Sequence, residues 1–211
     1  MNKKIIDALR WRYSVQAFDQ NKKVDQGDLE TILESGRLSA SSYGFEPWKF
    51  VVVENPQLRL QLREAAYGQA KVSESSHLIV LARRTDAREN IVGERIERTS
   101  KTFGVDKENL EDFRNMLQSS IDRQTDEVMD CDMRAQVYIA LGTMMETASL
   151  LGIDSIPIGG FESDMFDEIL GFKKKNLTAT VLLAIGYRGD DKNAERPKVR
   201  RPFAEVVEFI K

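Results

Sequence analysis

The segment 177-LTATVLLAIGY-187 restricts the possible fold more than any other part of the chain. Most of its residues are apolar and follow one another without a clear polar alternation, which is typical of a strand buried on both faces. Two shorter runs, 48-WKFVVV-53 and 77-HLIVLA-82, are rich in β-branched and aromatic residues and also predict strands. The sequence therefore predicts a sheet with at least one fully buried strand.

The helical pattern is strongest between residues 131 and 151. Apolar side chains cover so much of the helix circumference there that this helix should be central, and Gly152 should end it. Short helices are predicted over residues 5–11 and 163–170. Helices and strands alternate along the chain, so the fold class is α/β or α+β, with more helix than strand.

Two further helices have clear starts. Asp25 and Asn55 can each act as an N-cap, because a side-chain oxygen there accepts hydrogen bonds from free backbone N–H groups. The charged stretch 85–123 predicts surface helices with a break at Gly104. The apolar tail 203–210 is ambiguous in structure and needs a surface to pack on, for which a partner subunit is one candidate.

The composition limits the size and the partners of the protein. With 211 residues and 41% hydrophobic content, the chain suits one sizeable core, and we expect a single domain over residues 1–211. The formal net charge of −3 gives no basic excess, so we expect no nucleic-acid partner. Neither a membrane span of about 18 apolar residues nor a signal-peptide pattern is visible. We therefore expect a cytoplasmic protein without a membrane partner.

The chain has few side chains suited to difficult chemistry. It contains one cysteine, Cys131, and one histidine, His77. A zinc site needs more such ligands, so no metal is expected. His77 begins an apolar run, where a hydrogen-bonded structural role is more common than catalysis. If the protein is an enzyme, these residues favour chemistry carried by a bound cofactor.

Two short cationic clusters lie near the ends of the chain, 10-RWRYS-14 and 196-RPKVRRP-202. Each alone is best interpreted as a solvated charged loop. Together, Arg12, the hydroxyl of Ser14, Lys198 and Arg200 could supply charge-assisted donors to one phosphate monoester. This interpretation requires the two ends of the chain to meet.

Two turns could surround a flat ligand. The turn 156-IPIGGF-161 offers backbone N–H groups at Gly159 and Gly160 that no side chain shields, although a glycine pair alone indicates only a tight turn. The stretch 39-SASSYGFEPW-48 combines polar and aromatic residues that could form the wall of a pocket, or could simply join a helix to a strand. The spacing of these glycines does not match a dinucleotide-binding fingerprint.

Taken together, five segments resemble the FMN-dependent nitroreductase family of the oxygen-insensitive type. They cover nearly the whole chain in the order of the family, and only the stretch 85–130 matches in helical character alone. The segments are 12-RYSVQAF-18, 38-LSASSYGFEPWKFVVV-53, 65-AAYGQAKVSESSHLIV-80, 136-QVYIALGTMMETASLLGIDSIPIGGF-161 and 197-PKVRRP-202.

The resemblance implies a three-layer α+β fold with a central, mainly antiparallel sheet flanked by helices. It also implies a homodimer whose C-terminal segments are exchanged between subunits and which holds two FMN sites in its interface. The implied function is an NAD(P)H-dependent oxidoreductase, with NADPH or NADH as reductant and a small-molecule acceptor such as a nitroaromatic or a quinone. One shared cleft would give ping-pong kinetics. The alternatives are a specialised flavin reductase on the same fold, a protein that binds FMN without turnover, or a helical dimer module without a cofactor.

The resemblance assigns cofactor contacts residue by residue. The phosphate and ribityl chain of FMN are assigned to the first and last of the five segments. The flavin ring is assigned to polar residues and a glycine turn, and a serine turn of the other subunit is expected to cover the ring. The same turn, together with Phe113 or Leu117 of the stretch 103–118, is expected to contact substrate. The residues for the phosphate and ribityl chain are Arg12, Tyr13, Ser14, Lys198 and Arg200. The residues for the ring are Gln16, Gln69, Lys71, Ile158, Gly159 and Gly160. The serine turn consists of Ser41, Ser42 and Tyr43, and the expected substrate contacts include Ser42, Tyr43 and Phe113.

The sequence departs from the family at several of these positions. Gln16 stands where lysine is usual, and Gly159 where glutamate is usual. A cation near the pyrimidine edge stabilises the anionic reduced flavin, so the loss of the lysine matters unless Lys71 supplies that charge. Gly44 replaces asparagine, which is a mild change because both residues tolerate positive φ.

Overall fold

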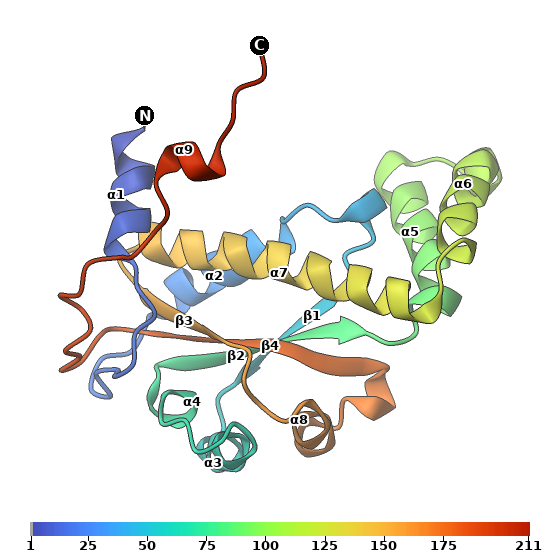
Figure 1. Cartoon of the computed structure of the whole chain (residues 1–211). Coiled ribbons are helices and arrows are strands. Elements are labelled where there is room, and N and C mark those ends of the chain that lie inside the picture. The colour runs from blue at the N-terminus through green and yellow to red at the C-terminus, as the bar shows by residue number, and fades with distance from the viewer. Residues whose placement is uncertain (1) are drawn as a thin grey trace.

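The long apolar run of the sequence forms an interior strand of a four-stranded sheet. A computed structural model describes residues 2–211, and its strands are arranged in the order β1-β2-β4-β3 with every pair antiparallel (Figure 1). The strands are β1 (Trp48–Val53), β2 (His77–Arg84), β3 (Asp154–Ile158) and β4 (Leu177–Gly186). The predicted α+β class and mainly antiparallel sheet are therefore confirmed.

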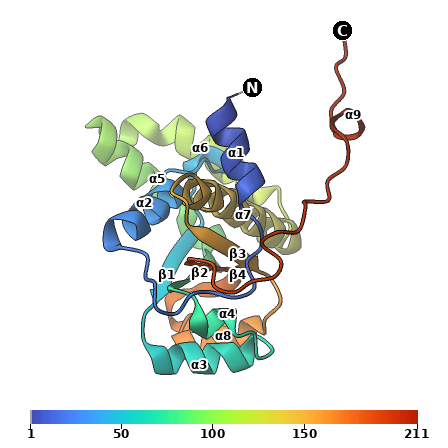
Figure 2. The ribbon, with the colours of Figure 1, turned by 90° about the vertical axis from the view of Figure 1, so that its left-hand side faces the viewer.

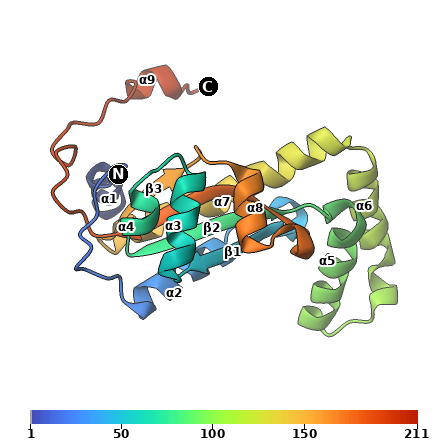
Figure 3. The same cartoon turned by 90° about the horizontal axis from the view of Figure 1, so that it is seen from below.

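Helices cover both faces of this sheet, which produces three layers (Figures 1 and 3). The helices of one face are α2 (Gln26–Arg37) and α7 (Asp126–Leu150), and α1 (Lys3–Trp11) packs on α7 away from the sheet. The helices of the other face are α3 (Pro56–Ala65), α4 (Lys71–Glu74) and α8 (Ser163–Leu170).

The sheet separates two apolar cores, because successive side chains of a strand point to opposite faces. In β2, Leu78 and Val80 pack with α3 and α8, whereas Ile79 and Leu81 pack with α2 and α7. All four side chains are fully buried. The continuous apolar character of β4 arises in the same way, since it contributes to both cores.

The predicted helix starts are confirmed. The side chain of Asp25 accepts a hydrogen bond from the backbone N–H of Asp28 at 2.9 Å, and that of Asn55 accepts from the backbone N–H groups of Gln57 and Leu58. The central helix α7 begins earlier than predicted, at Asp126. Thr125 caps it, and acidic residues alternate with the apolar ones over its first two turns, so apolar periodicity alone did not show where it begins.

The charged stretch forms an arm at one end of the molecule (Figure 3). The arm consists of α5 (Ala87–Phe103), a short 3-10 helix (Lys107–Leu110) and α6 (Glu111–Asp122). Gly104 ends α5 with a left-handed φ of 66°, which confirms the predicted break. A third apolar core holds the arm to the start of α7. Two other 3-10 turns occur, at Ser42–Gly44 and Lys173–Lys175.

The C-terminal segment leaves the body of the protein. The short helix α9 (Phe203–Val206) and the residues after it project away from the sheet and helices (Figure 2). Phe209 and Ile210 are 74% and 93% exposed, so the ambiguous apolar tail finds no packing surface within residues 2–211. Across the same residues, no helix combines the length and apolar character needed to cross a bilayer.

Candidate active site

The two cationic clusters meet in a single chain. Lys198 reaches back to the N-terminal helix, where its ammonium donates a hydrogen bond to the carbonyl oxygen of Leu9. Burial and the charge of Arg200 lower the pKa of Arg12, while burial and the charges of Arg12 and Arg200 lower the pKa of Lys198. The two chain ends therefore meet at Leu9 and Lys198, and Arg12, Lys198 and Arg200 lie within electrostatic reach of one another.

Arg12 also carries a donor that the protein does not use. Its Nε is buried and finds no hydrogen-bond acceptor within residues 2–211. An unpaired buried donor costs about 1–3 kcal/mol, more when it is charged. An anion with several acceptor oxygens would satisfy this donor and offset the repulsion among the three cations. The donor set therefore fits a phosphate monoester.

Ser14 and Gln16 face outward on an extended segment beside β3. Ser14 forms a parallel bridge with Ser155, and the side chains alternate, with Val15 buried and its neighbours exposed. The amide of Gln16 donates to the carbonyl oxygen of Ser14 at 2.8 Å, and its Oε1 accepts from the ammonium of Lys71 at 3.0 Å. Burial lowers the pKa of Lys71. The structure thus brings Ser14, Gln16 and Lys71 together.

The glycine turn after β3 is tied to the loop between α3 and α4. Ile158 is buried at the end of the strand, and Gly159 and Gly160 are exposed. Gln69 donates from Nε2 to the carbonyl oxygen of Gly160 at 2.7 Å. The Tyr67 hydroxyl adds a hydrogen bond to Glu162 at 2.5 Å. The turn therefore presents bare backbone next to the predicted polar pair of Gln69 and Lys71.

The serine turn lies elsewhere, against the arm. The backbone N–H of Ser42 donates to Oε1 of Gln136 at 2.9 Å, and Arg95 donates from Nε to the carbonyl oxygen of Tyr43 at 2.9 Å. Tyr43 has a left-handed φ of 54° although it is not glycine. Ser41 accepts a backbone hydrogen bond from Glu46 at 2.9 Å and so closes the turn.

Within one chain the serine turn is separated from the other predicted cofactor residues. It contacts α5, which lies at the opposite end of α7 from α1 (Figure 1). Phe113 lies on the same arm, half-buried against the third core, whereas Leu117 is fully buried in that core and cannot line a cleft in this structure. The single chain therefore assembles the residues predicted for the phosphate and the ring, but not those predicted for the cover.

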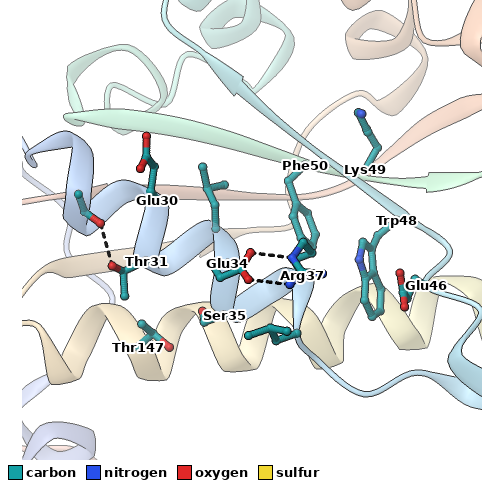
Figure 4. Close-up of a pocket in the computed structure, with 13 residues that line it drawn as sticks. Glu30, Thr31, Glu34, Ser35, Arg37, Glu46, Trp48, Lys49, Phe50 and Thr147 are labelled. Atoms are coloured by element: carbon teal, nitrogen blue, oxygen red, sulfur yellow. Dashed lines mark hydrogen bonds and ion pairs between the residues drawn. The ribbon is translucent and has the colours of Figure 1, made fainter. Parts of the chain in front are cut away.

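A groove of about 1010 Å³ runs between α2 and β1 (Figure 4). Its apolar lining includes Trp48 and Phe50, whose rings stack 6.1 Å apart, and a bidentate ion pair joins Arg37 to Glu34 at its side. Among residues 2–211, the lining includes none of the residues predicted to bind the cofactor. The groove follows the outer edge of β1, where the sheet ends.

Sequence reasoning missed an acidic group beside the cationic cluster. Asp191 accepts hydrogen bonds from the Tyr13 hydroxyl at 3.0 Å and from the backbone N–H of Gln16 at 2.6 Å. Asp154, 3% exposed, forms a bidentate ion pair with Arg188. The only sequence signal was the turn-forming pair 190-DD-191, which does not show which carboxylate points inward.

Comparison with known proteins gives a consistent result. The sequence model described as "Nitroreductase family" matches residues 9–187. A Staphylococcus haemolyticus protein whose name assigns it to the NAD(P)H nitroreductases is 38% identical over 218 residues, covering 100% of this chain and 99% of that protein. YfkO of Bacillus subtilis, with a name of the same kind, is 36% identical over 219 residues, covering 98% of this chain and 97% of YfkO.

Solved structures share the fold. A nitroreductase-like protein of Streptococcus mutans has a TM-score of 0.84 at 22% identity, with 100% of both chains covered. A structure from Exiguobacterium sibiricum, described as a nitroreductase in complex with FMN, has a TM-score of 0.82 at 24% identity, covering 98% of this chain and 97% of that one.

Proposed function

The chain belongs to the nitroreductase family of oxidoreductases, and we propose that it is an FMN-dependent NAD(P)H oxidoreductase acting as one FMN-binding domain. Its acceptors would be nitroaromatics, quinones or similar small molecules. The observation that carries the proposal is the unpaired, buried Nε of Arg12 within the cluster of Arg12, Lys198 and Arg200. The names of the relatives and the FMN-bound neighbour support it.

The cationic cluster would hold the FMN phosphate. Arg12, Lys198 and Arg200 would donate charge-assisted hydrogen bonds to the phosphate oxygens, and Ser14 would add a hydroxyl donor. Tyr13 would line the ribityl chain. Burial, and then the charges of Arg12 and Arg200, lower the pKa of Lys198. In this assignment the phosphate offsets both effects, so cofactor binding and the folding of both chain ends stabilise each other.

The ring would lie against the turn at Gly159 and Gly160, where bare backbone permits close approach and an N–H group can address the reactive nitrogen. Gln16, Gln69 and Lys71 would contact its polar edge. When bound, FMN supplies hydride transfer from the nicotinamide of NAD(P)H to the acceptor. The protein residues orient the ring and set its electrostatic environment, with Lys71, which bonds Gln16, as the cation at the predicted polar edge.

We further propose that the active protein is a homodimer. In one chain the serine turn cannot cover the cofactor, because it lies against the arm. In a dimer, Ser41, Ser42 and Tyr43 of one subunit would cover the FMN of the other, and the turn together with Phe113 would contact the acceptor. Tyr138 and Ile139, which are exposed on α7, provide apolar surface for the contact.

The exchanged C-terminal segment has a matching surface in the groove between α2 and β1. The tail is apolar and exposed, and the groove is apolar and borders an open sheet edge. Open edges are usually covered in native proteins. Removal of residues 203–211 should therefore produce a monomer by sedimentation, and a truncated protein that stays dimeric would contradict the exchange.

The proposed function is tested first by an absorbance spectrum. The purified protein should show flavin bands, or acquire them when FMN is added, and anaerobic NADPH or NADH should bleach them. A protein that takes up no FMN contradicts the proposal, and one that binds FMN but is not bleached is a flavin-binding protein without turnover. Because reductant and acceptor would share one cleft, initial-rate lines should be parallel, and intersecting lines would exclude ping-pong turnover.

A further inference from the structure

One buried carboxylate joins the two ends of the chain. Oδ2 of Asp191 accepts from the Tyr13 hydroxyl at 3.0 Å and from the backbone N–H of Gln16 at 2.6 Å, across 178 and 175 residues of sequence. Oδ1 accepts from the backbone N–H of Asn193 at 2.9 Å and from its side-chain amide at 3.0 Å. One oxygen therefore holds the N-terminal segment, and the other shapes the linker toward Lys198.

This carboxylate is ionised at neutral pH. Burial alone would raise its pKa, but the hydrogen bonds from Gln16, Asn193 and Tyr13 outweigh it and hold the pKa of Asp191 at about 2. Burial and the hydrogen bond to Asp191 raise the pKa of Tyr13, so the phenol keeps its proton and remains the donor. All four hydrogen bonds are therefore present throughout the physiological pH range.

The held segment contains the residues proposed for the phosphate. Tyr13 lies between Arg12 and Ser14, so the bond from its hydroxyl fixes the backbone on which both are carried. Arg188 supports the same segment from a second side, with its guanidinium carbon 4.3 Å from the ring centroid of Trp11 and 4.7 Å from that of Tyr13. The linker from Asp191 then reaches Lys198 seven residues later.

We propose that Asp191 is a positioning residue that pre-organises the cationic cluster for the FMN phosphate, an inference that rests on the proposed function. Because Asp191 is negatively charged, a positioning role and a purely electrostatic role predict opposite changes in FMN affinity when that charge is removed. A carboxylate at this end of the protein repels a phosphate, so removing its charge should strengthen FMN binding if only electrostatics acts. Removing a positioning group should weaken FMN binding instead, because the donors lose their common geometry.

The test compares FMN with riboflavin, which has the same ring but no phosphate. In Asp191→Asn the side chain keeps its size, but an amide NH2 group, which cannot accept a hydrogen bond, replaces one carboxylate oxygen. We expect the Kd for FMN, measured by quenching of flavin fluorescence, to rise about tenfold, as for loss of hydrogen bonds to a charged group. The Kd for riboflavin should rise less, by about twofold to threefold, because Gln16 at the ring edge loses its backbone bond to Asp191 while Gln69 stays bonded to the glycine turn.

Asp190→Asn is the matched control, because it removes the same charge from the exposed neighbouring residue. Its Kd for FMN should stay unchanged or fall slightly. Tyr13→Phe should reproduce part of the effect, and the double variant of Tyr13 and Asp191 should bind FMN no more weakly than Asp191→Asn alone.

The possible results distinguish a failure of the positioning role of Asp191 from a failure of the proposed function. Selective loss of FMN binding in Asp191→Asn supports the positioning role. Equal losses of affinity for FMN and riboflavin would indicate that Asp191 has a general folding role. Unchanged or tighter FMN binding would indicate that Asp191 acts only through its charge. Either result overturns the inference. If the unmodified protein binds neither flavin, the proposed function itself is wrong.

Discussion

The two ends of the molecule use arginine in opposite ways. At the arm, Arg95 and Arg98 direct donors at backbone carbonyl oxygens of the serine turn, at 2.9 to 3.3 Å. At the other end, Arg12 keeps a buried donor without an acceptor in residues 2–211 and lies close to two further cations. The arm arginines hold the protein's own backbone, whereas Arg12 is prepared for an anion from outside the chain.

Burial alone does not distinguish an arginine that binds a ligand from one that holds the protein's own backbone. Arg59 is 6% exposed, yet its guanidinium donates to the carbonyl oxygens of Val72, Ser75 and Ser76. It therefore fixes the segment around α4 and has acceptors inside the protein. A binding arginine is better recognised by an unused donor together with neighbouring like charge.

The largest effect should come from Arg12→Ala. It removes charge-assisted donors from the proposed phosphate site, so the Kd for FMN should rise by about 100-fold. Without FMN, the free energy of unfolding should not fall, because the variant also removes an unpaired donor and a repulsive charge. Flavin fluorescence titration and urea unfolding measure the two quantities. Arg10→Ala, on the exposed face of α1, is the control. Equal Kd values for the two variants would contradict the proposal that Arg12 binds the phosphate.

The second effect concerns stability at the arm. Gly44 has a φ of 67°, and a Cβ there would lie 3.0 Å from Cζ of Arg95. Gly44→Ala should therefore lower the free energy of unfolding by about 1–2 kcal/mol in urea titrations. The control is Gly93→Ala in α5, where a Cβ meets nothing within 4 Å, and which should stabilise the helix by up to about 1 kcal/mol. Similar shifts in both variants would show that the turn is not held in the way described.

A third effect tests a cation that does have a partner. Lys71 bonds Gln16, and its charge should still stabilise the reduced flavin. Lys71→Met should therefore make the reduction potential of bound FMN more negative by about 20 mV, or about 1 kcal/mol for two electrons. Redox titration against a reference dye measures it. Lys71→Arg keeps the charge and should restore most of the potential; a potential unaffected by Lys71→Met would assign the residue a purely structural role.

The smallest effect is a pH dependence of FMN affinity. The pKa of Lys198 is lowered from its ordinary 10.5, and a bound phosphate should raise it again. Affinity should therefore be full below the lowered pKa and decrease as pH rises through it, by about threefold, as for a partly exposed ion pair. Lys198→Arg stays charged and should flatten the profile measured by fluorescence titration. A profile equally steep in that variant would assign the titration to another group.

Much of the fold was predictable because its signals are local. The apolar runs of β1, β2 and β4 and the caps at Asp25 and Asn55 each depend on a few consecutive residues. The start of α7 was missed because acidic residues alternate with the apolar ones over its first two turns. Contacts over long separations were also missed: nothing near Asp191 shows that its partner is Tyr13, and the arm arginines look like any solvated charges in a charged stretch.

The candidate site was predictable only in part, for the same reason. The meeting of Arg12 with Lys198 and Arg200 followed from two cationic clusters and a resemblance. The contact between Gln16 and Lys71 places two residues together that were assigned to the same ring edge. The roles of these residues stay predictions until a flavin is measured on the protein.

The sheet that divides the two apolar cores has a consequence for how the protein can change over time. Ile79 and Val80 are neighbours in sequence but pack into different cores. Substitutions that are far apart on opposite sides of the sheet, such as in the buried faces of α3 and α7, should add independently, because they share no packing partners. One half of the interior can therefore be rebuilt by successive mutations while the opposite half keeps its original packing.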